Sequence, residues 1–301
     1  MNIKIIHSSN YVKKILTDNI LSSIAIHSIY NRTVNLLFGS QLLAIQSVGS
    51  PLSPISLITD ADEALLASLA ITTDTTVSLR DHCIQIGMHS FSFQDTVFQN
   101  LSLSVEQLAP RPSSGKILFI CQNTLKMISV SRCSGFAALW NQDCEKHSLI
   151  LSTADARMKD CQEALALGAD TDAAKNLIRL IGLGIGLTPS GDDFLCGALA
   201  ALDMITLSSA CETYVPSHVV TFRDTLQEEI ASHLADTNDI SGAFLTSALH
   251  HHYSLAINQL MSDCSFDDLL EAFRSIGHSS GIDTLCGIYF ILDCFKDIWQ
   301  G

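Results

Sequence analysis

Hydrophobic and polar positions follow different patterns in the two halves of the chain. The first half carries short apolar and β-branched runs that are typical of strands, and prolines divide them. These runs cover residues 33–38, 42–48, 55–58, 76–79, 96–105 and 116–121. Residues 39–41, Gly-Ser-Gln, join the first two runs, which predicts a β-hairpin.

From about residue 152 the apolar residues recur at helical spacing. The predicted helices cover residues 154–167, 172–181, 193–207, 217–234, 241–253, 266–276 and 283–298. We therefore predict an α+β protein, with a β-rich N-terminal domain at residues 1–150 and a mostly helical C-terminal domain at residues 151–301. Residues 116–130 fit either side of this boundary.

The composition favours a globular protein that binds neither nucleic acid nor membranes. Hydrophobic residues make up 47% of the 301 residues and charged residues 16%, which is far from the composition of disordered chains. The net charge is -14 and the 17 Lys and Arg residues are scattered, which argues against a nucleic-acid surface. No apolar stretch reaches the roughly 20 residues that cross a bilayer.

The cysteines and the N-terminus predict a cytoplasmic protein. The ten cysteines show no Cys-x-x-Cys spacing, so we interpret them as small buried apolar side chains. This usage fits a reducing compartment. The first residues lack the apolar core and cleavage site of a signal peptide.

A glycine-rich segment, GLGIGLTPSGDD at residues 182–193, joins two predicted helices. Such a loop can turn backbone N–H groups toward an anion, and the dipole of the next helix strengthens the binding. Asp192 stands where a Walker loop requires Lys, and the spacing is not that of a dinucleotide-binding loop. Asp192 and Asp193 would repel a bare phosphate unless Mg²⁺ bridges them or one of them accepts a proton. The segment predicts a pocket for phosphate or carboxylate.

Part of this segment is repeated near the C-terminus. Residues 190–197, SGDDFLCG, align without a gap with residues 280–287, SGIDTLCG. Ser-x-x-Asp is also the spacing of a helix N-cap, so plain capping explains half of the motif. It does not explain Asp192, the crowded glycines or His278. If the two helices cross at Gly197 and Gly287, where glycine is otherwise costly, their N-termini share one site.

Other candidate residues carry weaker signals. Arg32 and Asn35 lie next to a predicted strand and offer a guanidinium and an amide to an anion, although a surface Arg is the default. Residues 250–252 are three consecutive histidines, which point in different directions on a helix and favour a solvated helix end over a metal site. No nucleophile elbow is present, so covalent catalysis is unsupported.

The segments GLGIGLTPSGDDFLCGALAAL and GHSSGIDTLCG, with RTVNL before the hairpin, resemble the AllH family over nearly the whole chain. The resemblance implies a subunit of oxamate carbamoyltransferase, which converts oxalurate and phosphate into oxamate and carbamoyl phosphate in anaerobic allantoin and purine breakdown. It also implies partner subunits similar to FdrA and AllG. The resemblance names no cofactor, and Mg²⁺ is a candidate only through the adjacent carboxylates of Asp192 and Asp193.

Together, the physical argument and the resemblance define a candidate site. The candidate catalytic residues are Asp192, Asp193, His278 and Asp283. The candidate anion-binding residues are Gly184, Gly186, Thr188, Ser190, Gly191, Ser280, Gly281, Arg32 and Asn35. Asp192 and Asp193 would hold a metal ion if one is required. Two other functions stay open, a metal-dependent hydrolase of an amide or phosphate and a non-catalytic assembly subunit.

Overall fold

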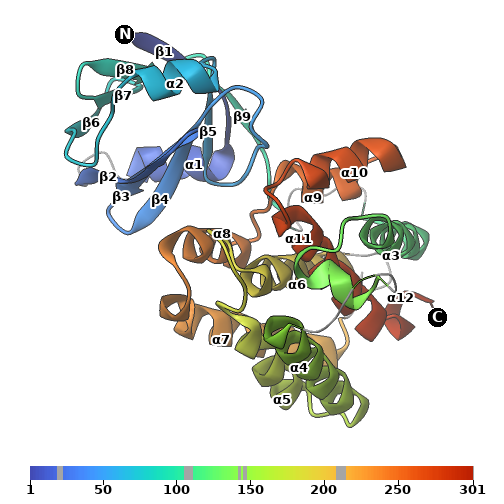
Figure 1. The fold of residues 1–301 in the computed structure, drawn as a ribbon. Helices are drawn as coiled ribbons and strands as arrows, with labels where there is room; N and C mark the ends of the chain where they lie inside the picture. The colour runs from blue at the N-terminus through green and yellow to red at the C-terminus, as the bar shows by residue number, and fades with distance from the viewer. Residues whose placement is uncertain (19–22, 105–110, 142–143, 145–147, 208–214, 301) are drawn as a thin grey trace. The chain divides into compact units, whose positions relative to one another are not determined.

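A computed structural model describes residues 1–18, 23–104, 111–141, 144, 148–207 and 215–300. The chain divides into two compact units, Met1–Leu101 and Ser102–Gly301. The first unit holds the sheet and the second is helical, which confirms the α+β class and the order of its two parts. Figure 1 shows both units as ribbons.

The described part of the N-terminal unit forms one nine-stranded sheet with two helices. The strands are β1 (Asn2–Ser9), β2 (Ile24–Tyr30), β3 (Thr33–Phe38), β4 (Gln41–Gln46), β5 (Ser56–Thr59), β6 (Val77–Arg80), β7 (Cys83–Ile86), β8 (His89–Ser92) and β9 (Val97–Gln99), and the helices are α1 (Asn10–Asp18) and α2 (Glu63–Ser68). Their order is β2-β3-β4-β5-β1-β8-β7-β6, and β9 pairs with β1. β1 is antiparallel to β5 and parallel to β8 and β9, so it joins the two sides of the sheet.

The predicted hairpin is present as β3 and β4. Phe38 pairs with Gln41 in an antiparallel register, which leaves a two-residue turn. Gly39 in this turn has φ +62°, a conformation that glycine adopts without steric cost. Leu36, Phe38 and Leu43 are fully buried, so both strands contribute to the core of this unit.

The described part of the second unit consists of helices packed around one hydrophobic core. They are α3 (Ser114–Ser129), η1 (Gly135–Leu139), α4 (Leu149–Ala166), α5 (Asp170–Leu177), η2 (Ile178–Leu180), α6 (Ser190–Leu207), α7 (Ser217–Ser232), η4 (Leu234–Asp236), α8 (Asp239–Leu249), α9 (Leu255–Leu260), α10 (Phe266–Arg274), α11 (Ser280–Cys294) and α12 (Asp297–Gln300). No helix in the described ranges has the length and apolar character that crossing a bilayer demands.

The predicted strand at residues 116–121 is wrong, because these residues lie in α3. A short apolar run is compatible with a strand or a buried helix, and only the longer pattern separates them. Ile117, Ile120, Thr124 and Met127 are buried at helical spacing, and Ser113 caps the helix by accepting the N–H of Lys116. With α3 helical, the second unit begins at Ser102, whereas the sequence pattern placed the domain boundary at residue 150.

The interpretation of all cysteines as small buried side chains is wrong at one disulfide pair and at four free cysteines that are only partly buried, Cys83, Cys196, Cys264 and Cys294. Cys133 and Cys144 form a disulfide, with the Cys133 residue exposed. The other described cysteines are free, and of these Cys121, Cys161 and Cys286 are buried as expected. Cys211 lies outside the described residues.

Helices α6 and α11 form the centre of the second unit and cross at glycine (Figure 1). A Cβ added at Gly197 would overlap the carbonyl oxygen of Thr284, and one added at Gly287 would overlap that of Phe194. Each helix therefore packs its glycine directly on the other's backbone. The crossing that the repeat predicted is confirmed, and it explains why glycine stands inside two buried helices.

We expect Gly197→Ala to lower the free energy of unfolding by roughly 1–3 kcal/mol or more, because the added methyl group must push the two helices apart. Gly287→Ala should act alike. Gly115→Ala in α3 is the matched control, since its added Cβ meets only Ser113 Oγ at 3.8 Å. The control should be neutral or stabilising by up to about 1 kcal/mol. Urea unfolding of the three variants checks this, and equal losses at residues 115 and 197 would contradict the crossing.

Candidate functional site

The crossing brings the N-termini of α6 and α11 together. The hydroxyls of Thr188, before α6, and Ser280, at the start of α11, lie 2.7 Å apart. The same two hydroxyls face Asp193 and lower its pKa. The side chains of Ser190 and Ser279 act in the same way on Asp283. Each aspartate is thus approached by the serine that begins the other helix.

This reciprocal arrangement replaces the helix caps that the Ser-x-x-Asp spacing also allowed. The N-cap of α11 is Ser279, and its side chain makes no cap hydrogen bond. α6 begins at Ser190 directly after Pro189, whose carbonyl accepts the N–H groups of Asp192 and Asp193. The serine and the aspartate of each Ser-x-x-Asp motif therefore interact with the other helix and not with each other.

Burial dominates the electrostatics of Asp193 and Asp283. Burial raises the pKa of Asp283 to about 7, against the opposing effects of its donors. The pKa of Asp193 lies well above its ordinary value, first because of burial and then because of the nearby charge of Asp283. The residue Asp193 is partly exposed as a whole, but its Oδ2 atom is buried. The pair therefore holds at least one proton at neutral pH.

Each of these two carboxyl groups keeps one oxygen without a partner. Asp193 Oδ2 and Asp283 Oδ2 are buried and accept no hydrogen bond from any residue that the structure describes. Leaving a buried polar atom unpaired costs free energy, and a catalytic or ligand-binding role is one reason why a protein keeps such an atom. Protonation or a bound ligand would satisfy them.

The backbone at the start of η1 covers Asp283. Phe136 donates its N–H to Asp283 Oδ1 at 2.6 Å, and this donor lowers the pKa of the carboxyl. Gly135 has φ +55° and lies so close that an added Cβ would overlap both carboxylate oxygens. Only glycine fits here, for its conformation and for its lack of a side chain.

Asp192 points away from this pair and fixes the glycine-rich loop. One of its oxygens accepts the N–H of Gly182 at 2.7 Å, and the other accepts the hydroxyl of Thr237. The side chain of Ser241 also lowers its pKa, while burial raises it. Both oxygens of Asp192 are engaged, so this residue, predicted as catalytic, is placed as a support for the loop.

The loop itself combines unusual backbone angles with free donors. Gly182, Gly184 and Gly186 have φ of +68°, +147° and +114°. An added Cβ at Gly184 would overlap the backbone nitrogen of Ser190, whereas at Gly186 it would meet open space. The N–H groups of residues 184–188 donate to no other described residue. They are open to an anion or to water.

Gly191 and Gly281 have a packing role. A Cβ at Gly191 would overlap the carbonyl oxygen of Leu180, and a Cβ at Gly281 would overlap that of Phe273. These equivalent contacts seat the two helix starts on the preceding segments. The structure gives each glycine a steric reason, and the anion-binding role that the sequence suggested for both stays a prediction.

The remaining candidates, all of which the structure describes, are not among the residues that interact with the paired aspartates. His278 is exposed in the turn before α11. Arg32 and Asn35 belong to the N-terminal unit, where Arg32 lies 3.9 Å from Glu63 and the buried Asn35 donates to Ser28 Oγ at 3.0 Å. Arg32 therefore takes part in a surface ion pair, and Asn35 in a hydrogen bond within the sheet.

The described residues contain no group of three or more His, Cys, Asp or Glu side chains placed to hold a metal ion. Among the three histidines, His251 Nδ1 contacts Asp203 Oδ2 at 2.9 Å, and Asp203 also accepts the hydroxyl of Tyr253. A cavity of about 370 Å³ lies at the other end of α11, lined among others by His218 and Asp293. It is separate from the helix starts.

Sequence reasoning missed several residues that build the site. Gly135 and Phe136 reach Asp283 from a segment 147 positions away, and Thr237 reaches Asp192 from 45 positions away. No local motif marks these residues. Asn238 caps α8, and Ser241 in the first turn of that helix lies beside Asp192.

Comparison with protein families settles the relationship of the chain. The model of the AllH family N-terminal domain matches residues 4–101, and the model of oxamate carbamoyltransferase subunit AllH matches residues 180–292. The chain belongs to the AllH family. The first AllH match ends where the N-terminal unit ends, and the second contains both helix starts. Searches of curated proteins and of solved structures found no match.

The AllH family name indicates a subunit of oxamate carbamoyltransferase. It also implies that the chain works within a complex of several subunits. In this AllH chain the matched residues include Thr188, Ser190, Asp193, Ser280 and Asp283, which the structure brings together.

We expect stability to fall as pH rises from about 4 to about 7, because the folded state holds a proton on Asp283 that the unfolded state releases near pH 3.8. The stabilisation is fully present below the unfolded pKa and is lost as pH passes the folded pKa. Asp283→Asn should reduce this total loss of unfolding free energy by on the order of 4 kcal/mol at most, at about 1.4 kcal/mol per pKa unit. The slope of stability against pH should therefore be flatter in the variant.

Thermal unfolding between pH 4 and pH 8 measures this slope. Asp263→Asn is the control, since its side chain is fully exposed. Part of the slope should persist in Asp283→Asn, because Asp193 titrates in the same direction. A variant slope identical to that of the parent would show that Asp283 ionises as an ordinary carboxyl.

Proposed function

We propose that this chain binds the anionic reactants of a phosphate-dependent carbamoyl transfer where α6 and α11 begin. One observation carries the proposal: two helix starts meet around two buried carboxyl groups, each with an unpaired oxygen. Helix N-termini favour anions through their free N–H groups and dipoles. Carboxyls that are protonated at neutral pH do not repel such anions.

The proposed reaction converts oxalurate and phosphate into oxamate and carbamoyl phosphate. An oxygen of phosphate attacks the carbamoyl carbon, the carbon–nitrogen bond to oxamate breaks, and the departing nitrogen takes a proton. Asp283, with a pKa of about 7, or Asp193 supplies that proton as a general acid. The N–H groups of residues 184–188 hold the phosphate, and Asp192 fixes their loop.

The proposed partners are subunits similar to FdrA and AllG. Ile185 and Leu187 on the loop are 85% and 53% exposed, so two large apolar side chains stand in solvent on the loop that borders the site. In the proposal they contact a partner that closes the site. His278, exposed before α11, is a second candidate for moving a proton. Arg32 and Asn35 receive no role in it.

A non-catalytic assembly subunit is the second candidate function, and the same exposed Ile185 and Leu187 favour it. In that case the chain would bind partners and no small anion. A metal-dependent hydrolase is less well supported, because both oxygens of Asp192 already accept hydrogen bonds.

Reconstitution tests the leading proposal. We expect the chain, co-expressed with its FdrA-like and AllG-like partners, to release carbamoyl phosphate from oxalurate only when phosphate is present and only when this chain is included. Full activity of the partners alone would leave the chain without a catalytic role.

In that complex, Asp193→Asn and Asp283→Asn should each lower kcat by roughly 10²- to 10⁴-fold, the usual contribution of a general acid. Asp263→Asn should leave kcat unchanged. Phosphate or carbamoyl phosphate should also raise the melting temperature of the isolated chain, since a ligand that binds only the folded state stabilises it. No shift at millimolar ligand, together with unchanged kcat in both variants, would favour the assembly role.

A further inference from the structure

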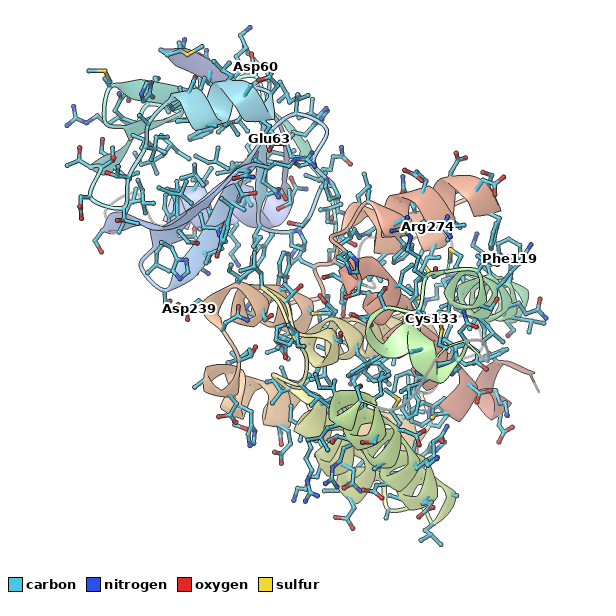
Figure 2. The ribbon with its side chains drawn as sticks, in the orientation of Figure 1. Asp60, Glu63, Phe119, Cys133, Asp239 and Arg274 are labelled. Carbon is cyan, nitrogen blue, oxygen red and sulfur yellow. A yellow bond between two sulfur atoms is a disulfide. The ribbon has the colours of Figure 1, made fainter. Side chains whose placement is uncertain are left out.

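The backbone that covers Asp283 begins directly after a disulfide. Cys133 and Cys144 are joined, and η1 lies between them. Figure 2 labels Cys133 beside η1. Gly135 and Phe136, the first residues of η1, are the ones that touch the Asp283 carboxyl. The disulfide therefore restrains the chain two residues before its contact with this buried acid.

We propose that the Cys133–Cys144 disulfide is a thiol-controlled clamp that holds the Gly135–Phe136 backbone against Asp283. Gly135 and Phe136 are positioning residues, because they act on the reaction only through the carboxyl. Regulation of carbamoyl transfer by the clamp rests on the proposed function. The existence of the clamp does not.

Two restraints hold this backbone, and they act on different parts of it. The Phe136 ring is fully buried and packs against Phe194 of α6, with ring centroids 5.9 Å apart. This packing holds the side chain whether or not the disulfide is formed. The disulfide instead holds the path of the main chain through Gly135, whose φ of +55° aims the Phe136 N–H at Oδ1.

The two sulfurs differ in access, which determines how the clamp opens. The Cys133 residue is exposed, whereas Cys144 is 8% exposed. The thiolate of a small dithiol reductant attacks Cys133 Sγ, the S–S bond breaks, and Cys144 leaves as a thiolate that takes a proton. The second thiol of the reductant then displaces Cys133, which is also protonated. The reductant leaves as a disulfide, having supplied two electrons.

Opening the clamp changes the chemistry of Asp283. The Phe136 N–H favours the ionised carboxylate and so lowers the pKa of Asp283. When the main chain relaxes, this donor weakens and the pKa rises above about 7. The other groups that interact with the carboxyl are Ser190, Ser279, Asp193 and Cys286. They lie on or just before the two crossing helices and keep their places. The reduced protein therefore keeps a protonated Asp283 to higher pH.

Hydrogen exchange of the Phe136 amide, with and without dithiothreitol, tests the clamp on the full chain. We expect reduction to speed this exchange at least tenfold while the Leu245 amide in α8 is unaffected. The carboxyl carbon signal of Asp283 should titrate at higher pH in the reduced protein. The double variant Cys133→Ser with Cys144→Ser should show the Phe136 exchange rate and the Asp283 titration of the reduced protein. Dithiothreitol should change neither of them. Cys264→Ser, a change at a free cysteine of the same unit, should respond as the parent does.

The outcomes separate the clamp from the proposed function. Equal Phe136 exchange and equal Asp283 titration in the oxidised and reduced proteins would overturn the clamp, as would free Cys133 and Cys144 thiols after treatment with oxidised glutathione. Faster exchange at Leu245 as well as at Phe136 would also overturn it, because reduction would then loosen the whole unit. These readouts need neither substrate nor partner, so a clamp can be present even if carbamoyl transfer is absent.

Discussion

The close contact between α6 and α11 is the constraint on which the rest of the helical unit depends. Two largely buried helices approach until the glycine of each lies on a carbonyl oxygen of the other. No side chain can stand between them at Gly197 and Gly287. This approach brings the helix starts together, and the chain around them supplies Gly135, Phe136 and Thr237 to the carboxyl groups that the crossing buries.

The helix dipole and burial act in opposite directions on the ionisation of those carboxyl groups, and their relative sizes decide whether the groups are charged. The dipole of a helix N-terminus favours a negative charge by typically 0.3–1 kcal/mol, up to about 2 kcal/mol in partly buried sites. Burial raises the pKa of Asp283 to about 7 even though several donors oppose it, which corresponds to on the order of 4 kcal/mol. The cost of burial is larger than the gain from the dipole, so neutral carboxyl groups stand at helix ends whose dipoles favour negative charge. Burial also raises the pKa of Asp192, although both of its oxygens accept hydrogen bonds.

The sequence predicted the fold class, the hairpin and the central helices because these follow from local periodicity. It also predicted the crossing, since Gly197 and Gly287 break the rule against glycine in helices and so required a packing reason. Residues 116–121 were misread because five or six apolar residues fit a strand as well as a helix. The contacts of Phe136 with Asp283 and of Thr237 with Asp192 join distant segments and leave no local pattern. The disulfide between Cys133 and Cys144 was missed for the same reason, because no local pattern marks the pairing.

The reciprocal placement of serine and aspartate has a consequence for how such a chain can change. Ser190 serves Asp283, and Ser280 serves Asp193, so each half of the repeat completes the other. A substitution of the serine in one half therefore changes the surroundings of the aspartate in the other half, where the sequence is unaltered. The two segments are therefore interlocked, and related chains should exchange these four positions in compensating pairs, one residue from each helix, instead of drifting independently.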